Sequence, residues 1–310
     1  MLAKSQNFPQ FSQFTQFSHS ITALITPFSG GKIDEPAFEK IINHQIANGT
    51  SGIVPCGTTG ESPTLTNSEH DRVIELAIEI SAGRIPVMAG TGSNSTLEAI
   101  ERTQHAEQAG ADAALIMTPY YNKPTQQGIY QHFEAIHNAS NIPLYIYNIP
   151  GRSVVDILDS TIAKLATLPR VRGIKDATAD LSRVFSLKAA LKTAQTGQDG
   201  GFSMLSGEDA TAVEFNMLGG CGCISVTANI APRILADMQD ASLKGDVAKA
   251  KQLNDKLAPL HQLMFAETNP IPVKYAMSIL GFCRDEVRLP LTKPTKTLQT
   301  KLQQLLTDFS

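Results

Sequence analysis

Lys175 is the residue whose type and setting most strongly indicate covalent chemistry. It ends an apolar strand-like run, residues 172–175, and Asp176 follows it. A charged lysine is costly to bury, so a lysine in such a place is either paired or has a lowered pKa. A lowered pKa leaves part of the amine neutral and nucleophilic, as Schiff-base formation requires. The alternatives are an ion pair with Asp176 or a side chain that reaches a phosphate or solvent.

Imine chemistry also requires groups that move protons, and three hydroxyl side chains lie in or just after strand-like runs. Tyr147 lies in the run before Lys175, while Thr59 and Tyr121 come directly after two earlier runs. Tyrosine and threonine hydroxyls pass protons in series without leaving a permanent charge in a site. For each tyrosine, the alternative is a packing residue whose hydroxyl is satisfied elsewhere.

The glycine-rich segment 57–62 and Arg152 are candidate anion sites. The segment reads Gly-Thr-Thr-Gly-Glu-Ser and offers backbone N–H groups and hydroxyls at the start of a helix, which suits a carboxylate. It lacks the lysine of a P-loop. Arg152 is suited to hold a second carboxylate by two parallel hydrogen bonds. A tight turn without a ligand and a surface arginine are the alternatives.

Strand-like runs and amphipathic helical segments alternate along the chain, mostly at the interval of about 30 residues typical of a βαβ unit. The eight runs span residues 21–27, 52–56, 86–90, 113–118, 143–148, 172–175, 202–206 and 221–226. Helical patterns such as 71–81 and 96–109 lie between them, with Asn67 and Asn94 interpreted as helix caps. This alternation predicts an α/β fold, a TIM (β/α)8 barrel whose active site gathers the strand ends that carry the candidate residues.

The two ends of the chain differ from this pattern. From residue 243 onward only helical patterns occur, at 246–265, 271–280 and 295–309, with breaks at Asn269-Pro270 and Leu289-Pro290. The first residues are rich in Gln, Phe and Ser. We therefore predict a flexible tail over 1–19, a catalytic barrel over 20–242 and a C-terminal helical domain over 243–310. A targeting or docking segment is the alternative for the tail.

Composition narrows the classes of function. In 310 residues, 26 Lys+Arg oppose 29 Asp+Glu, so the net charge of −3 provides no basic stripe for nucleic acid. No stretch approaches the ~18 consecutive apolar residues of a membrane-spanning helix. The seven histidines are scattered, so we expect no metal and no cofactor. The four cysteines lack zinc-site spacing, and we expect reduced thiols in a cytoplasmic protein, with a redox-active pair at Cys221 and Cys223 as the alternative.

Three motifs together resemble one family. Residues 57–62, the segment Tyr-Asn-Ile-Pro at 147–150 and the segment Gly-Ile-Lys-Asp at 173–176 occur in the order and at the strand ends of the dihydrodipicolinate synthase and N-acetylneuraminate lyase family of class I aldolases. The resemblance covers about residues 20–306. It implies an imine between Lys175 and pyruvate, and a proton relay of Tyr147, Thr59 and Tyr121, with Tyr121 reaching into a neighbouring subunit.

The same resemblance implies how substrates are held. Thr58 and Thr59 would bind the pyruvate carboxylate, and Gly207 and the carbonyl of Ile224 would line the pyruvate pocket. Within the family, the segment Thr-Pro-Tyr-Tyr-Asn-Lys-Pro at 118–124 and Arg152 favour the branch that condenses pyruvate with L-aspartate-4-semialdehyde to 4-hydroxy-tetrahydrodipicolinate, in lysine biosynthesis through diaminopimelate. Arg152 would receive the carboxylate of the semialdehyde.

Other activities remain open at this point. A sugar-acid aldolase or an N-acetylneuraminate lyase would use the same lysine, and some sugar-acid aldolases keep an arginine like Arg152. A catalytically silent lysine-binding relative is a further alternative, although it would have no use for a relay beside a desolvated amine. A metal-dependent barrel enzyme is the last alternative activity.

The resemblance also implies an assembly and a regulator. Members of the family form homodimers, usually paired into tetramers, and many synthases are inhibited by L-lysine at the dimer interface. Five positions match the lysine-binding residues of such relatives: Pro63, His70, Asn94, Glu98 and Tyr120. Asn67 departs from the pattern, because feedback-sensitive bacterial relatives often carry histidine there and plant relatives tryptophan. Ordinary interface and helix-cap residues are the alternative for this set.

Overall fold

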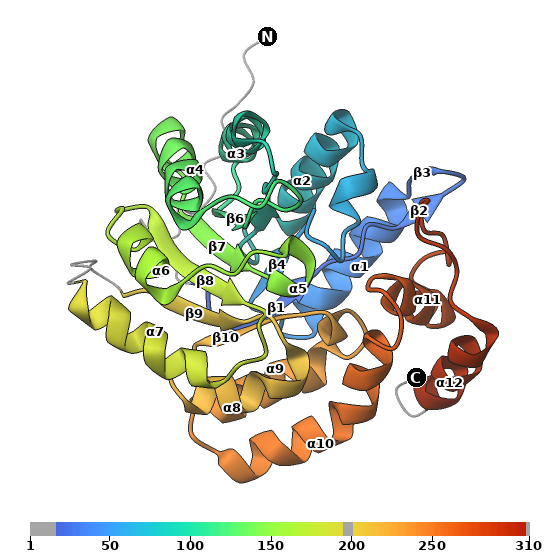
Figure 1. The fold of residues 1–310 in the computed structure, drawn as a ribbon. Helices are drawn as coiled ribbons and strands as arrows, with labels where there is room; N and C mark the ends of the chain where they lie inside the picture. Colours follow the sequence, from blue (N-terminus) through green and yellow to red (C-terminus); the bar gives the residue numbers. More distant parts are fainter. Residues whose placement is uncertain (1–16, 195–200, 308–310) are drawn as a thin grey trace.

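Eight short parallel strands surround the centre of the molecule in the computed structural model, which describes residues 17–194 and 201–307 (Figure 1). The strands are β1 (His19–Ala23), β4 (Gly52–Val54), β5 (Met88–Gly90), β6 (Ala113–Met117), β7 (Leu144–Asn148), β8 (Val171–Asp176), β9 (Ser203–Ser206) and β10 (Gly222–Ser225). Each of the eight predicted runs contains or overlaps one of these strands. An additional antiparallel pair, β2 (Phe28–Ser29) and β3 (Lys32–Ile33), follows β1.

The strand order closes the sheet into a barrel. Neighbouring strands follow the order β4, β1, β10, β9, β8, β7, β6, β5. The two ends of this series, β4 and β5, meet through a parallel bridge between Ile53 and Val87, where the N–H of Ile53 donates to the carbonyl of Pro86 over 3.1 Å. Closure pairs the strand edges that an open sheet would leave exposed. The predicted TIM barrel is confirmed.

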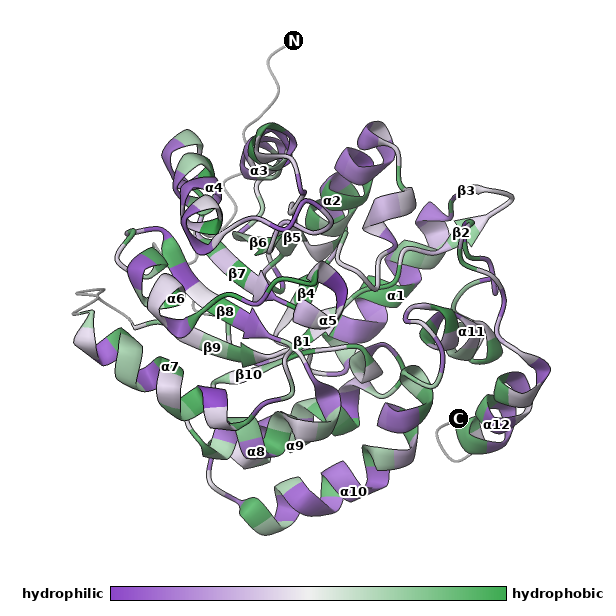
Figure 2. Cartoon of the chain, viewed as in Figure 1, coloured by the Kyte–Doolittle hydropathy of each residue, from purple (hydrophilic) through white to green (hydrophobic). Residues whose placement is uncertain are grey.

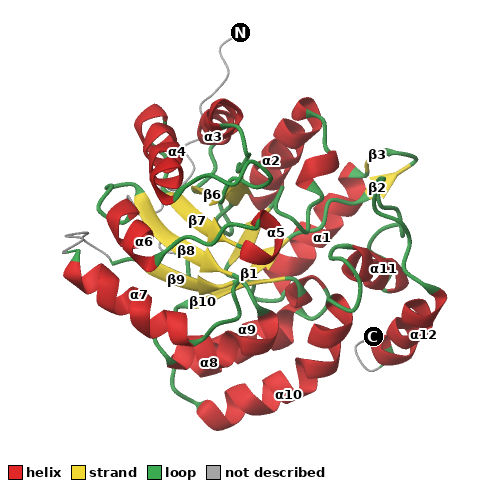
Figure 3. Ribbon diagram, in the orientation of Figure 1, coloured by secondary structure: helices red, strands yellow, loops and turns green. Residues whose placement is uncertain are grey.

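Helices form a ring around the strands (Figure 3). They are α1 (Glu35–Ala47), α2 (Asn67–Ser81), α3 (Thr96–Ala109), α4 (Gln126–Ala139), α6 (Asp159–Leu165), α7 (Ser182–Thr193), α8 (Ala212–Met217) and α9 (Pro232–Leu243). Figure 2 shows hydrophilic and hydrophobic residues alternating along their turns, as expected of helices with one face toward a core. No helix in the described part of the chain is both long enough and apolar enough to cross a membrane.

Two predicted helix caps are wrong by one residue. The cap of α2 is Thr66 and not Asn67, because the Thr66 hydroxyl accepts from the backbone N–H of Glu69 and the Glu69 carboxylate accepts from the N–H of Thr66. The cap of α3 is Ser95 and not Asn94. A hydroxyl residue followed three positions later by glutamate makes both bonds of a capping box, which explains why Thr66 ends the loop before α2.

Every second residue of a strand points into the barrel, and this alternation determines which of the candidate residues face the interior. The interior side chains include Met88, Leu115, Tyr145, Tyr147 and Leu205. Gly173 of β8 must lack a side chain, because a Cβ there would lie 2.6 Å from the ring of Tyr145. Lys175 comes two residues later on the same strand and therefore faces the same interior at its C-terminal end.

The predicted C-terminal helices are present as α10 (Val247–Met264), α11 (Ile271–Ile279) and α12 (Lys296–Leu306). Figure 1 shows α11 near α1, which lies at the other end of the sequence, and α12 on the outer side of α11. Residues 1–16 of the predicted tail lie outside the described residues. Phe17 is buried with its ring edge-on to Tyr145, so the chain already packs against the barrel before residue 20. The division at residues 20 and 243 stays a prediction.

A buried ion pair joins the C-terminal helices to the barrel. The ammonium group of Lys274 in α11 lies 2.5 Å from Oε1 of Glu61, and both side chains are fully buried. The second carboxylate oxygen of Glu61 accepts from the backbone N–H of Arg288 over 3.0 Å, and the Lys274 ammonium lies 4.0 Å from the centroid of the Phe28 ring. Burial lowers the pKa of Lys274, while the Glu61 carboxylate acts in the opposite direction.

The buried ion pair between Lys274 and Glu61 predicts that removal of one charge lowers the free energy of unfolding more than removal of both. Lys274→Met leaves the Glu61 carboxylate buried without its partner and should lower the free energy of unfolding by about 3 to 5 kcal/mol. The double variant Lys274→Met with Glu61→Gln should recover most of that loss. Urea denaturation measures both, with Lys244→Met, which removes an exposed ion pair with Asp240, as the control that should stay near the wild type. Equal losses in the single and double variants would contradict this account.

Candidate active site

Lys175 and Tyr147 lie side by side at the C-terminal end of the barrel strands. They are register partners on the adjacent strands β8 and β7, and the Lys175 ammonium lies 4.3 Å from the centroid of the Tyr147 ring. Lys175 is 6% exposed and Tyr147 is 5% exposed. Two neighbouring strand ends therefore supply the predicted nucleophile and the first predicted member of its relay.

No carboxylate lies within ion-pair distance of the Lys175 amine in the described part of the chain, although the charge of Lys175 acts on the Glu208 carboxylate from farther away. The adjacent carboxylate of Asp176 points to the other side of the strand, where Nε of Arg183 lies 3.0 Å away and the N–H of Thr178 donates to it over 2.9 Å. The structure therefore does not support an ion pair between Lys175 and Asp176. An unpaired, buried amine is the setting that nucleophilic catalysis by lysine requires.

The glycine-rich segment turns tightly after β4 and carries two threonines of the predicted site. The hydroxyl of Thr26 holds this turn by donating to the carbonyl of Gly60 over 2.7 Å. Thr59 is buried, and its Oγ1 accepts a hydrogen bond of 3.0 Å from Nδ2 of Asn269. Thr58 lies at the wall of a cavity.

Arg152 comes from the short helix α5 (Pro150–Ser153), which follows β7 directly. Its Nη2 donates to the backbone carbonyl of Asn269 over 3.1 Å. Asn269 therefore contacts both Thr59 and Arg152, and the sequence analysis missed it as a functional residue. The only sequence signal was the Asn-Pro break between two helical patterns, which marks a loop without indicating what that loop touches.

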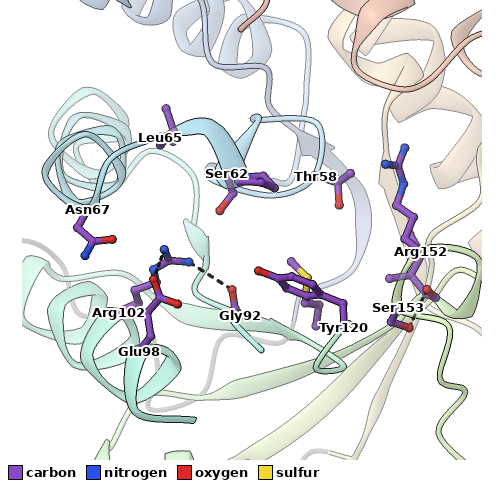
Figure 4. A pocket seen from close by; sticks show the side chains of 13 residues that line it. Thr58, Ser62, Leu65, Asn67, Gly92, Glu98, Arg102, Tyr120, Arg152 and Ser153 are labelled. Atoms are coloured by element: carbon purple, nitrogen blue, oxygen red, sulfur yellow. Dashed lines mark hydrogen bonds and ion pairs between the residues drawn. The ribbon is translucent and has the colours of Figure 1, made fainter. Parts of the chain in front are cut away.

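A cavity of about 460 Å3 lies beside these groups (Figure 4). Thr58 and Arg152, from the predicted substrate set, line it together with Pro63, Glu98 and Tyr120 from the predicted lysine set. Figure 4 shows the Tyr120 side chain between the Glu98 side and the Arg152 side of the cavity. The two predicted sets thus share one cavity within a single chain.

An arginine that the sequence analysis did not consider also lines this cavity. Nη2 of Arg102 lies 2.6 Å from Oε1 of Glu98, one turn earlier on α3, and the Ser93 hydroxyl donates to the other Glu98 oxygen. The dashed lines in Figure 4 trace the contacts of Arg102 with Glu98 and with the carbonyl of Gly92. Glu98, the predicted partner for an ammonium ligand, therefore already has a cationic neighbour.

Two members of the predicted lysine set do not line the cavity. His70 is fully buried in α2, where its Nε2 donates to the carbonyl of Gly90 over 2.9 Å. Burial lowers its pKa to about 4, so the ring is neutral at physiological pH. The backbone carbonyl of Asn94 accepts from Nδ2 of Asn122 over 2.8 Å. Both residues therefore lie outside the lining of the cavity.

Three further predicted residues lie at other strand ends. Tyr121 is 88% exposed and has a left-handed φ of 71°, so a single chain does not bring it to Tyr147. The backbone N–H of Gly207 donates to the carbonyl of Asp176 over 2.6 Å, and a Cβ on Gly207 would clash with Ala177 at 2.7 Å. Ile224 is buried in the interior of β10.

Asp209 is a further buried group that the sequence analysis did not assign a role. One of its oxygens accepts from the N–H groups of Val226 and Thr227 over 2.9 and 3.1 Å, and the other accepts from the Ser225 hydroxyl. These bonds satisfy the backbone where β10 ends, directly after Ile224, and therefore fix that strand end. All four cysteines are free thiols, and the described residues contain no cluster of three or more potential metal ligands.

Comparisons with known proteins agree with this arrangement. The model of the dihydrodipicolinate synthetase family matches residues 16–309. The 4-hydroxy-tetrahydrodipicolinate synthase of Methylobacterium radiotolerans is 57% identical over 282 residues, which are 90% of this chain and 92% of that protein.

Two solved structures are also similar. The chloride-inhibited dihydrodipicolinate synthase of Acinetobacter baumannii complexed with pyruvate is 45% identical, has a TM-score of 0.90, and is matched over 94% of this chain and 99% of that one. The synthase of Cyanidioschyzon merolae with lysine bound is 36% identical, has a TM-score of 0.88, and is matched over 94% and 97%. The match over nearly the whole length, together with the motifs at three strand ends, establishes that the chain belongs to the dihydrodipicolinate synthetase family.

Proposed function

We propose that this chain is a lyase-type enzyme that condenses pyruvate with L-aspartate-4-semialdehyde to give 4-hydroxy-tetrahydrodipicolinate in lysine biosynthesis. The observation that carries the proposal is the buried amine of Lys175, which has no carboxylate within ion-pair distance in the described chain and lies next to Tyr147. The name of the Methylobacterium relative and the pyruvate complex of the Acinetobacter structure support this choice of substrates. The cytoplasmic location stays a prediction from the sequence.

The chemistry begins with attack of the neutral Lys175 amine on the keto carbon of pyruvate. Loss of water from the carbinolamine gives a protonated imine, and removal of a methyl proton gives an enamine. The enamine carbon then attacks the aldehyde carbon of the second substrate, whose oxygen takes up a proton. The amino group that came from the semialdehyde then attacks the imine carbon and closes the ring. Lys175 leaves as the free amine, so the enzyme is regenerated.

The proposed roles of the hydroxyl groups follow from their positions. Tyr147 lies against the Lys175 side chain and is placed to transfer protons to and from the carbinolamine and the enamine. Thr59 is buried in the turn after β4 and would continue the relay. The exposed Tyr121 would complete it in the active site of a neighbouring subunit, which requires a homodimer, or a tetramer built as a pair of dimers.

Carboxylate binding accounts for the remaining site residues. The turn with Thr58 and Thr59 would hold the pyruvate carboxylate by backbone N–H groups and hydroxyls. Arg152 lines the cavity and would bind the carboxylate of the semialdehyde. Gly207 and the carbonyl of Ile224 would close the pyruvate pocket at the ends of β9 and β10.

Trapping with borohydride tests the proposed nucleophile. Reduction of the enzyme with pyruvate should leave a stable pyruvate-derived adduct on Lys175, located by mass spectrometry of peptides, and Lys175→Ala should abolish both the adduct and the condensation. Lys192→Ala, at the end of α7, is the control that should retain both. Absence of the adduct in the wild type would remove the Schiff-base mechanism. An adduct without turnover of semialdehyde would indicate a sugar-acid aldolase.

Mixing two inactive variants tests whether Tyr121 completes the active site of a neighbouring subunit. Tyr121→Phe and Tyr147→Phe should each lower kcat by about a hundredfold or more, because each removes a proton-transfer group. Unfolding and refolding an equal mixture should restore up to about a quarter of wild-type activity, because half of the dimers then contain one intact site. A refolded mixture as inactive as its parents would contradict the placement of Tyr121 in a neighbouring subunit.

We also propose that L-lysine binds in the cavity lined by Pro63, Glu98 and Tyr120 and inhibits the enzyme. The Glu98 carboxylate would bind the lysine side-chain ammonium while it also accepts a hydrogen bond from Arg102. The lysine-bound structure of the Cyanidioschyzon relative supports the proposal. Asn67 lines the same cavity and replaces the histidine of feedback-sensitive relatives.

Lysine should therefore lower the condensation rate and raise the melting temperature of the wild type in a concentration-dependent manner. Glu98→Gln removes the carboxylate while keeping the shape of the side chain, and it should abolish both effects. Glu101→Gln, an exposed neighbour on α3, should respond like the wild type. A wild type whose rate and melting temperature do not change at saturating lysine would exclude this regulation.

A further inference from the structure

The residues that directly follow Tyr147 and Lys175 are joined by a network of side chains on the outer face of the barrel strands. Tyr147 is followed by Asn148, the last residue of β7, and Lys175 is followed by Asp176, the last residue of β8. Asn148 and Asp176 are register partners and are 0% and 7% exposed. Because successive side chains of a strand alternate in direction, these two point away from the interior that Tyr147 and Lys175 face.

Arg183, in the first turn of α7, is the centre of this network. Its Nη1 donates to both carboxylate oxygens of Asp156, over 2.9 and 2.8 Å, and its Nε lies 3.0 Å from Oδ2 of Asp176. Its Nη2 lies 3.3 Å from Oδ1 of Asp159. The helix dipole disfavours a cation in the first turn of a helix, so the carboxylates, and not the helix, account for an arginine at this position.

Asp156 connects Arg183 to β7. Its Oδ1 accepts a hydrogen bond of 2.7 Å from Nδ2 of Asn148, whose Oδ1 accepts from the backbone N–H of Ile157 over 3.2 Å. These two contacts fix the orientation of the amide, because the reverse orientation would place its oxygen against a carboxylate and its NH2 group against an N–H. The path from Asn148 through Asp156 and Arg183 to Asp176 thus forms a ring with the paired strands.

Without the guanidinium group, like charges would face each other across the ends of the two strands. Burial raises the pKa of Asp176, hydrogen bonds from Thr178 and the charge of Arg183 lower it, and the charge of Asp156 raises it again. Asp156 and Asp176 therefore repel each other, and Arg183 compensates this repulsion. Since Asp156 is bound to β7 and Asp176 belongs to β8, uncompensated repulsion would push apart the strand ends that carry the proposed nucleophile and its neighbouring tyrosine.

We propose that Arg183 is a positioning residue that holds the ends of β7 and β8 together from the outer face and thereby fixes the distance between Tyr147 and the Lys175 amine. The inference rests on the proposed function, because it takes Lys175 as the nucleophile. Arg183 acts through Asn148 and Asp176. Its loss should slow the steps that need both the amine and the tyrosine, and it should leave the binding of the pyruvate carboxylate at the turn after β4 nearly unchanged.

The most direct measurement is the exchange of pyruvate methyl hydrogens for deuterium in D2O, which requires the imine and the enamine but no semialdehyde. Arg183→Met removes the guanidinium group and keeps most of the side-chain volume. Well below its melting temperature, this variant should exchange about tenfold to a hundredfold more slowly, because a small misplacement of reacting groups has an effect of that order. The borohydride-trapped adduct on Lys175 should also form more slowly. The KM for pyruvate should stay within about threefold of the wild type.

A double variant distinguishes repulsion from a loss of packing. Asp156→Asn alone should slow exchange less than Arg183→Met does, because the amide oxygen still accepts a hydrogen bond. Combined with Arg183→Met, it removes the repelling charge, so the double variant should exchange at least as fast as Arg183→Met alone. If both substitutions acted only through packing or stability, their effects would multiply and the double variant would be the slowest of the three.

Arg72→Met is the matched control. Arg72 in α2 also bridges carboxylates, those of Glu35, Glu75 and Glu79, but it contacts no proposed site residue in the described part of the chain. Its loss should lower the melting temperature without slowing exchange. Wild-type exchange in Arg183→Met, multiplied losses in the double variant, or equal slowing in Arg72→Met would overturn the inference alone. A wild type that forms no adduct and shows no exchange would overturn the proposed function and this inference with it.

Discussion

The buried ion pair between Glu61 and Lys274 is the contact on which the geometry of the site depends. Two charges out of water are stable only when each is close to the other and hydrogen-bonded, so the pair tolerates little movement between the loop after β4 and α11. That loop carries the threonines of the site, and α11 directly follows Asn269. The ion pair therefore fixes a barrel loop and a C-terminal loop in one arrangement, and the Asn269 to Thr59 hydrogen bond lies within it.

The barrel supplies a different constraint, the pairing of β7 with β8. Parallel pairing in one register places Tyr147 beside Lys175, and the alternation of side chains directs both into the interior. Gly173 keeps space for the Tyr145 ring below them. The strands thus position the proposed nucleophile and Tyr147, while the loops and the C-terminal helices position the other groups that we propose to bind carboxylates and transfer protons. This division separates reaction type from substrate choice within one fold.

Residues of the proposed lysine site and of the proposed catalytic site line the same cavity. Tyr120 lies in it between the Glu98 side and the Arg152 side, and Tyr121, the next residue, is turned outward. A ligand that contacts Tyr120 therefore acts on a segment whose neighbour is the proposed intersubunit relay residue. Arg102 changes the electrostatics of this cavity, because its guanidinium offsets the negative charge that Glu98 would present to a cationic ligand.

The sequence by itself determined those features of the fold and the site that follow from patterns of neighbouring residues. Strict alternation of strands and helices predicted the barrel, and Lys175, Tyr147 and Arg152 could be found because they follow or end apolar runs. Only the tertiary structure decided which distant residues meet them. Asn269 contacts Thr59 across 210 residues and Arg152 across 117, and no periodicity records such contacts. Arg102 was missed for a related reason: its spacing from Glu98 is typical of any helical ion pair, and only the packing of loops around α3 turns that pair toward a cavity.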